Sequence, residues 1–211
     1  MTRRVVLATR NEHKVHELTQ ILADLVAELD LEIVSVADFP GVEDVPETEV
    51  TFVGNATLKA QAVCRATGLP ALADDSGLAV DVLGGSPGVF SARWSGSTAG
   101  ADAPRAVRDR ANLDLLLEQV ADVPDEHRGA AFRCAAVLAL PGGDTVSAEG
   151  AVHGALIPVP RGTNGFGYDP AFVPTGSDRT LAEHTDEEKN AISHRGAAFR
   201  ALEPLLRAAL G

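Results

Sequence analysis

The residues best suited to chemistry fall into four clusters, and the first stands where an apolar run gives way to a helical pattern. It reads Thr9-Arg10-Asn11-Glu12-His13-Lys14. Backbone N–H groups at the start of a helix, with threonine and asparagine side chains and a lysine one turn in, can bind an anion such as phosphate. An ordinary helix cap with an exposed lysine is the alternative interpretation of the same residues.

The second and third clusters bring amide, ammonium and carboxylate groups together. Asn55 and Lys59 are four residues apart and therefore share one face of a predicted helix. Asp74-Asp75-Ser76-Gly77 follows a short apolar run. Adjacent carboxylates repel each other unless a cation is present, so they are candidate ligands for a hard metal ion, with Glu47 in the acidic stretch 38–49 as a further carboxylate. A turn at the end of a strand is the alternative.

The fourth cluster combines the loop 163–170, which contains Phe166 between two glycines, with Lys189 and Ser193-His194-Arg195. An aromatic ring held in a glycine-rich loop can expose its face to a nucleobase. A phenylalanine packed into the core is the alternative. His194 and Arg195 fall on the polar side of a predicted helix, which predicts exposed charges near a helix end.

The elements that must position these clusters alternate between strands and helices. Apolar patterns predict strands at 3–9, 32–36, 71–73, 78–83, 130–140 and 145–156, the last two joined by a hairpin turn at 141–144. Periodic apolar residues predict helices at 15–29, 51–67 and 104–120. Thr185 and Glu188 form a capping box before a C-terminal helix, which Pro204 is expected to kink or end early. The order predicts an α/β fold with a mixed sheet.

Charge narrows the classes of partner. The chain has 30 acidic and 18 basic residues, a net charge of −12. Such a chain repels polyanions, so no binding to nucleic acid or to a membrane surface is expected. Phosphate would have to be held by a metal ion or by a few placed cations. Only three of the basic residues are lysines, and all three lie in the clusters: Lys14, Lys59 and Lys189.

Cysteine usage and apolar runs indicate the compartment. Cys64 and Cys134 form no C-x-x-C pair, which predicts two buried thiols in a reducing environment rather than a zinc site or a disulfide. The first apolar run is too short for the core of a signal peptide, and none approaches the ~18 residues needed to span a bilayer. A cytoplasmic protein is expected.

Five strings, in order over nearly the whole chain, carry a resemblance to a known family: ATRNEHK (8–14), TFVGNATLKA (51–60), ADDSGLAVDVLGGSPGVFSAR (73–93), GFGYDP (165–170) and EEKNAISHRG (187–196). The chain resembles the inosine/xanthosine triphosphate pyrophosphatases. The resemblance implies one domain over 1–211 with an inosine triphosphatase-like fold, an elongated mixed β-sheet flanked by helices in two lobes with a central cleft. It also implies a homodimer that hydrolyses dITP, ITP and XTP to the monophosphate and pyrophosphate with Mg²⁺.

The resemblance also assigns roles to residues. Asp75 aligns with the catalytic acid, which is a metal ligand and accepts a proton. Glu47 is the best match for the second metal ligand, with Glu43 and Glu49 as alternatives. Gly54 stands where the family more often has glutamate, so the helix 51–67 is assigned no metal role. The substrate contacts implied are Thr9, Arg10, Asn11, Lys14, Asn55, Lys59, Ser76, Phe166, Gly167, Tyr168, Asp169, Lys189, His194 and Arg195.

Two other functions are compatible with parts of the sequence. A pyrophosphatase of the septum-formation type would have the related fold and act on pyrimidine or modified nucleotides, but the strings GFGYDP and SHRG argue against it. A nucleotide-binding module without activity is the second, and the presence of Asp74, Asp75 and Lys14 together argues against it.

Overall fold

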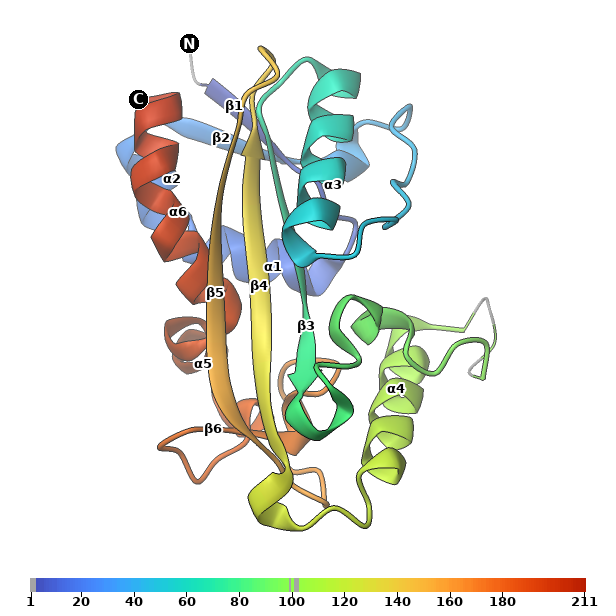
Figure 1. Cartoon of the computed structure of the whole chain (residues 1–211). Coiled ribbons are helices and arrows are strands. Elements are labelled where there is room, and N and C mark those ends of the chain that lie inside the picture. Colours follow the sequence, from blue (N-terminus) through green and yellow to red (C-terminus); the bar gives the residue numbers. More distant parts are fainter. Residues whose placement is uncertain (1–2, 99, 101–102) are drawn as a thin grey trace. The chain divides into compact units, whose positions relative to one another are not determined.

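A computed structural model describes residues 3–98, 100 and 103–211. Its strands form a 6-stranded sheet in the order β2-β1-β3-β4-β5-β6 (Figure 1). They are β1 (Arg3–Leu7), β2 (Leu31–Ser35), β3 (Ala71–Val80), β4 (Gly129–Ala139), β5 (Thr145–Leu156) and β6 (Phe172–Pro174). β1 is parallel to β2 and β3, whereas β6 is antiparallel to β5. The predicted α/β fold with a mixed sheet is therefore confirmed.

The helices follow the predicted order with some changes of boundary. They are α1 (Glu12–Ile21), α2 (Ala23–Glu28), α3 (Phe52–Thr67), α4 (Arg105–Gln119), α5 (Asp186–Ile192) and α6 (His194–Leu210). The single helix predicted at 15–29 is two helices, which meet at Leu22 with φ −91° and ψ 0°. None of the helices that the structure describes is both long and apolar enough to cross a bilayer.

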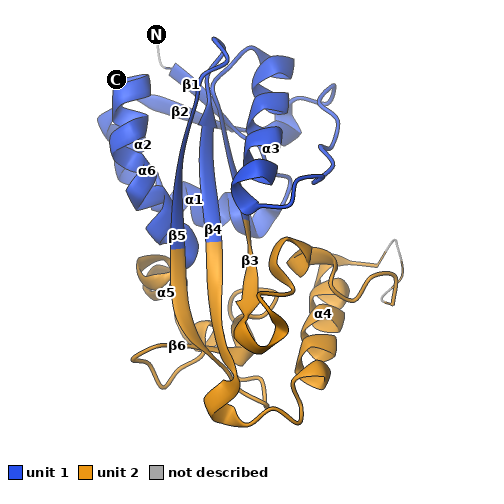
Figure 2. Ribbon diagram, in the orientation of Figure 1, with its two compact units in different colours: residues 1–75, 134–150, 194–211 blue, residues 76–133, 151–193 orange. Residues whose placement is uncertain are grey.

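The chain divides into two compact units (Figure 2). Unit 1 comprises residues 1–75, 134–150 and 194–211, and unit 2 comprises residues 76–133 and 151–193. β3, β4 and β5 contribute residues to both units, so each unit contains a part of the sheet.

Strand alternation builds the core of unit 1 on two faces of its part of the sheet. Val5 and Leu7 pack with buried residues of α1, α2 and α6, while Val6 and Ala8 pack with α3. Successive side chains of a strand point to opposite faces, so one apolar strand supports helices on both sides. Figure 2 shows α3 on one side of these strands and α6 on the other.

The core of unit 2 joins its strands to α4. Leu78 and Val80 of β3 lie in one buried cluster with Leu113 and Leu116 of α4. Phe132 and Phe172 meet there edge to face, with ring centroids 4.9 Å apart. This cluster fixes β3 and α4 relative to each other within unit 2.

Two elements run further than their local sequence predicts. β3 continues through Asp74-Asp75-Ser76-Gly77, where a turn between two shorter strands was predicted. α6 continues past Pro204 to Leu210 and does not end early. Proline removes one helical hydrogen bond, but the buried residues Leu202, Leu206 and Leu210 keep the helix on the core of unit 1.

Candidate active site

β3 places its two adjacent aspartates on opposite faces of the sheet in unit 1. Asp74 and Asp75 are 2% and 5% exposed. Leu72 packs with the α1 and α6 cluster and Ala73 with the α3 cluster, so the alternation directs Asp74 toward α1 and α6 and Asp75 toward α3. The sequence interpretation of the two carboxylates as one ligand pair is therefore wrong, because each has its own partners.

Asp74 is surrounded by cations. Its Oδ2 accepts hydrogen bonds from Lys14 Nζ at 2.9 Å and from Nε and Nη2 of Arg195, both at 3.2 Å. Burial alone would raise the pKa of Asp74, but the charges of Lys14 and Arg195 outweigh it and hold the pKa far below its ordinary value. Asp74 therefore stays ionised and orders the cations around it.

Asp75 belongs to a second group with Lys59 and Glu47. Lys59 Nζ lies 3.0 Å from Asp75 Oδ1 and 2.9 Å from Glu47 Oε1, so one ammonium bridges two carboxylates. Glu43 and Glu49, the alternatives for the second acid, are both exposed. The structure thus brings Glu47, of the three acids considered, to Asp75.

Burial raises the pKa of Asp75 above its ordinary value, and the charge of Glu47 acts in the same direction against the attraction of Lys59. Burial lowers the pKa of Lys59, but Asp75 and Glu47 outweigh it and the net shift is upward. Lys59 therefore remains charged beside a carboxylate that binds a proton more readily than an exposed aspartate does.

The turn before α1 has the features of an anion site. Asn11 caps the helix, with Oδ1 accepting from His13 N at 3.2 Å, and Thr9 Oγ1 accepts from Asn11 N at 3.2 Å. The buried Asn11 Nδ2 has no hydrogen-bond partner in the described part of the chain. Arg10 was predicted to contact the substrate. In the structure its guanidinium donates to Asp44 Oδ1 at 2.8 Å and to Val42 O, both in the acidic loop 38–49.

Asn55, predicted to face a triphosphate, is instead fully buried. Its Nδ2 donates to Asp75 Oδ2 at 3.3 Å and its Oδ1 accepts from Glu49 N at 2.9 Å. Both ends of the amide are engaged, so Asn55 is a positioning residue that ties Asp75 to the acidic loop.

Gly54 allows that loop to pass close to α3. A Cβ at this position would stand 2.7 Å from Glu49 Cβ and 2.9 Å from Thr51 Oγ1, the cap of the helix. Gly54→Ala is therefore expected to lower the free energy of unfolding by about 1 kcal/mol, although alanine is the better helix former by about that amount. Urea denaturation measures the change.

Gly41→Ala is the matched control for Gly54→Ala. A Cβ at Gly41 meets no heavy atom within 4 Å. Its effect is expected to stay within about 0.5 kcal/mol. A Gly54→Ala variant more stable than the wild-type chain would contradict the close approach of the acidic loop.

The second set of predicted residues forms a loop site in unit 2. Asp169 Oδ2 accepts from Lys189 Nζ at 2.8 Å and from Phe166 N at 2.9 Å, and both charged side chains are buried. Gly165 has φ +72°, and a Cβ there would lie 2.2 Å from Asp169 Oδ2. The ion pair thus fixes a loop that only glycine can complete at position 165.

Phe166 is half-buried rather than part of the core. Lys189 Nζ lies 4.8 Å and the Arg105 guanidinium 5.8 Å from the centroid of its ring. These cations lie within cation–π range, and the partly exposed ring fits the interpretation that it can stack with a flat ligand. Arg105 was not predicted, and no local pattern of α4 indicates its place beside Phe166.

Tyr168 and Gly167, both predicted to contact the substrate, stabilise the structure of unit 2. Tyr168 is 4% exposed in the apolar cluster, and its hydroxyl donates to Ser91 O at 2.8 Å. Burial raises the pKa of Tyr168 well above its ordinary value. Gly167 precedes it with φ +63° and supplies no side chain, while Ser76 on β3 is half-buried.

The prediction that His194 and Arg195 are surface charges is wrong. They are 5% and 1% exposed, respectively. Besides Asp74, the guanidinium of Arg195 pairs with Glu17 of α1. Sequence reasoning missed Glu17, and its only signal is its position three residues after Lys14 on the same helix.

The residues around Lys59 fit a magnesium ion. No group of three or more His, Cys, Asp or Glu in the described residues forms a metal cluster. Mg²⁺ usually binds through one or two carboxylates and takes its remaining oxygens from water and substrate phosphates. Glu47 and Asp75 hold a positive charge between them already, so the pair supplies the donors that such an ion needs.

Known proteins are similar to this chain over nearly its full length. A model of the Ham1 family matches residues 5–205. A dITP/XTP pyrophosphatase of Streptomyces avermitilis is 58% identical over 208 residues, 99% of each chain. The structure of a HAM1 protein from Coxiella burnetii matches with a TM-score of 0.83 and 39% identity, covering 98% of this chain and 100% of that one. A nucleoside-triphosphatase, also named dITP/XTP pyrophosphatase, from Mycobacterium abscessus matches with a TM-score of 0.74 and 49% identity, covering 96% and 99%. The chain belongs to the Ham1 family.

Proposed function

We propose that this protein hydrolyses the deaminated purine nucleotides dITP, ITP and XTP to the monophosphate and pyrophosphate, with Mg²⁺. The observation that carries the proposal is the Lys59 ammonium held between the carboxylates of Glu47 and Asp75. Two acids and a buried cation can receive both a metal ion and the phosphates that accompany it. The substrate named for the relatives supports the choice of nucleotide.

Glu47 and Asp75 would hold the ion, and the ion would neutralise charge on the phosphate oxygens. Lys59 and Lys14 would bind further oxygens of the triphosphate. Asn11 Nδ2, the buried donor without a partner among the described residues, would add a hydrogen bond from the turn before α1. Each of these groups belongs to unit 1.

Asp75 would orient a water molecule and take its proton. The water oxygen forms a bond to the α-phosphorus, the bond from that phosphorus to the bridging oxygen breaks, and pyrophosphate leaves with the electron pair. Asp75 is buried, and Lys59 and Asn55 hold its carboxylate in place, which suits it to position a water molecule for proton transfer. Asn55 Nδ2 donates to Asp75 Oδ2, while Lys59 binds Oδ1, and the two contacts keep the carboxylate in one orientation.

The base would be recognised by stacking and by hydrogen-bond donors. Hypoxanthine and xanthine have a C6 carbonyl, which accepts a hydrogen bond, whereas adenine has an amino group there. Phe166 would stack with the ring, and Lys189 beside it supplies N–H donors. A 6-amino group would leave such a donor unpaired, which costs about 1–3 kcal/mol for each buried group.

Release of pyrophosphate from a panel of nucleotides tests the proposal. With Mg²⁺, kcat/KM for dITP, ITP and XTP is expected to exceed that for dATP by about 100-fold or more. Chelation of the metal is expected to abolish turnover. Hydrolysis of dATP as efficient as that of dITP would overturn the proposed base specificity, and preferential hydrolysis of dTTP or UTP would favour the septum-formation type.

A further inference from the structure

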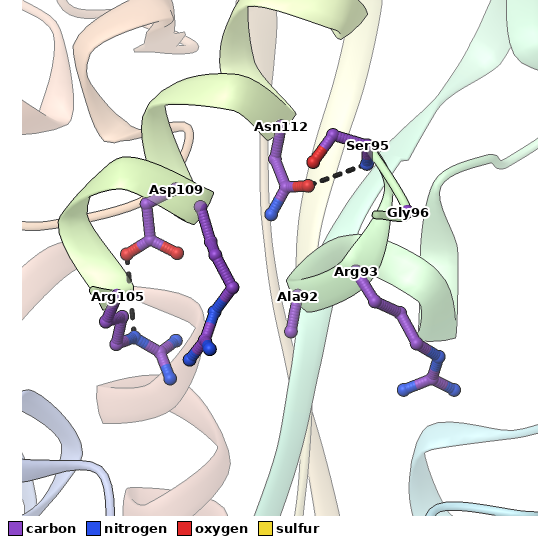
Figure 3. Close-up of a pocket in the computed structure, with 8 residues that line it drawn as sticks. Ala92, Arg93, Ser95, Gly96, Arg105, Asp109 and Asn112 are labelled. Atoms are coloured by element: carbon purple, nitrogen blue, oxygen red, sulfur yellow. Dashed lines mark hydrogen bonds and ion pairs between the residues drawn. The ribbon is translucent and has the colours of Figure 1, made fainter. Parts of the chain in front are cut away.

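Unit 2 contains a pocket that the proposed reaction does not use. Its volume is about 290 Å³, and it lies between α4 and the segment 92–96, which comprises the end of the short helix Gly88–Arg93 and the residues after it (Figure 3). Arg105, Arg108, Asp109 and Asn112 line it from α4. Arg93, Arg105 and Arg108 line the pocket together with Asp109, in a chain whose net charge is −12.

Asn112 presents an unpaired donor to this pocket. The side chain is 1% exposed, and its Oδ1 accepts from Ser95 N at 2.7 Å. Its Nδ2 is buried and has no hydrogen-bond partner within the described ranges. In Figure 3 the amide nitrogen points into the space between α4 and Ala92. A buried donor without an acceptor is costly, so an acceptor from a ligand would stabilise this site.

Arg108 leaves positive charge at the same place. Arg105 faces Asp109 at 3.5 Å, and the Arg93 guanidinium lies over the Phe90 ring at 5.3 Å. For the half-buried Arg108, no ion pair or side-chain hydrogen bond occurs with any residue that the structure describes. The aspartate of the pocket is thus offset by Arg105, and the charge of Arg108 remains available.

We propose that this pocket binds the phosphate group of a small anion. Guanidinium and amide N–H groups match phosphate oxygens, and none of the described residues that line the pocket is aromatic and could stack with a base. Its volume lies just below the range of about 300–1,000 Å³ that is typical of small-molecule sites, which suits inorganic pyrophosphate or the phosphate of a nucleotide. The proposal does not depend on the hydrolytic reaction.

The only tryptophan of the chain gives a local readout. Trp94 stands between the lining residues Arg93 and Ser95, and its Nε1 donates to Gln119 Oε1 at 2.9 Å. Titration with sodium pyrophosphate, without divalent metal and at constant ionic strength, is expected to change its fluorescence in a saturable way. A parallel titration with dAMP distinguishes a nucleotide phosphate from the free anion.

Two variants test the donors. Arg108→Gln is expected to weaken the binding of pyrophosphate about 10- to 100-fold, which is the contribution of a charged hydrogen bond. Asn112→Asp keeps the acceptor for Ser95 N and replaces the donor with a carboxylate, so binding is expected to be lost. Arg110→Gln is the matched control, since Arg110 is exposed on the same helix and pairs with Asp114.

A third variant distinguishes anion binding in this pocket from anion binding in unit 1. Lys59→Gln removes the ammonium group that pairs with Glu47 and Asp75 in unit 1. The fluorescence titration of this variant is expected to remain as in the wild-type chain. The proposal is overturned if the wild-type chain gives no saturable change with either probe. It is also overturned if Arg108→Gln titrates as tightly as the wild-type chain, or if Lys59→Gln alone removes the signal.

Discussion

Asp75→Asn is expected to lower kcat for dITP about 10²- to 10⁴-fold, the range that a general base contributes. Asparagine has the size of aspartate and keeps an oxygen that can accept from Asn55 Nδ2, now 3.3 Å from the carboxylate. It cannot take a proton from water, and it removes the charge that faces Lys59 at 3.0 Å. Pyrophosphate release at saturating dITP and Mg²⁺ measures the loss.

The control for this variant is Asp144→Asn, an exposed aspartate in the β4–β5 hairpin of the same unit. It is expected to turn over like the wild-type chain. Thermal unfolding of both variants separates a loss of chemistry from a loss of structure. Turnover of Asp75→Asn near the wild-type rate would remove Asp75 from the role of base and leave Glu47 as the acid to examine.

Local signals predicted most of the elements that carry these residues. Thr51 caps α3 and Gly68 ends it with φ +70°, as the sequence predicts. The hairpin between β4 and β5 and the capping box of Thr185 and Glu188 are confirmed as well. Each of these features depends on residues within a few positions of one another, so the sequence contains the whole interaction.

β3 shows where local reasoning stops. Asp74-Asp75-Ser76-Gly77 has the composition of a turn, but the segment belongs to β3, which neighbours β4 in the sheet, and it lies beyond the pairing of β3 with β1 at Ala71 and Leu72. Pairing within the sheet outweighs the weak local preference of such residues. The consequence for the site is large, because a strand separates the two aspartates onto opposite faces and a turn would not.

The environment of Arg195 could not be predicted from α6 alone. Its partner Asp74 is 121 positions away in the sequence and Glu17 is 178 positions away. A helical pattern assigns a charged residue to the solvent side by default, since a lone buried charge is too costly. Only the fold shows that the compensating carboxylates come from β3 and α1.

Arg195→Met is expected to lower the free energy of unfolding by about 3–5 kcal/mol, the cost of removing one partner from a buried ion pair. Methionine fills much of the volume, but Asp74 loses the two hydrogen bonds at 3.2 Å and Glu17 loses its ion pair with the guanidinium. Among the described cations, Lys14 would then be the one that still hydrogen-bonds to the buried carboxylate of Asp74. The expected fall in melting temperature is on the order of 10 °C.

Arg200→Met is the matched control on the same helix, because Arg200 is exposed and its loss is expected to cost no more than about 0.5 kcal/mol. Arg195→Lys refines the test. Lysine restores the charge but cannot reproduce a planar fork that reaches Asp74 and Glu17 together, so an intermediate stability is expected. If Arg195→Met unfolds at the wild-type temperature, the guanidinium is not what compensates Asp74. If Arg195→Lys matches the wild-type chain, charge alone holds this face of β3, and the geometry of the fork contributes nothing.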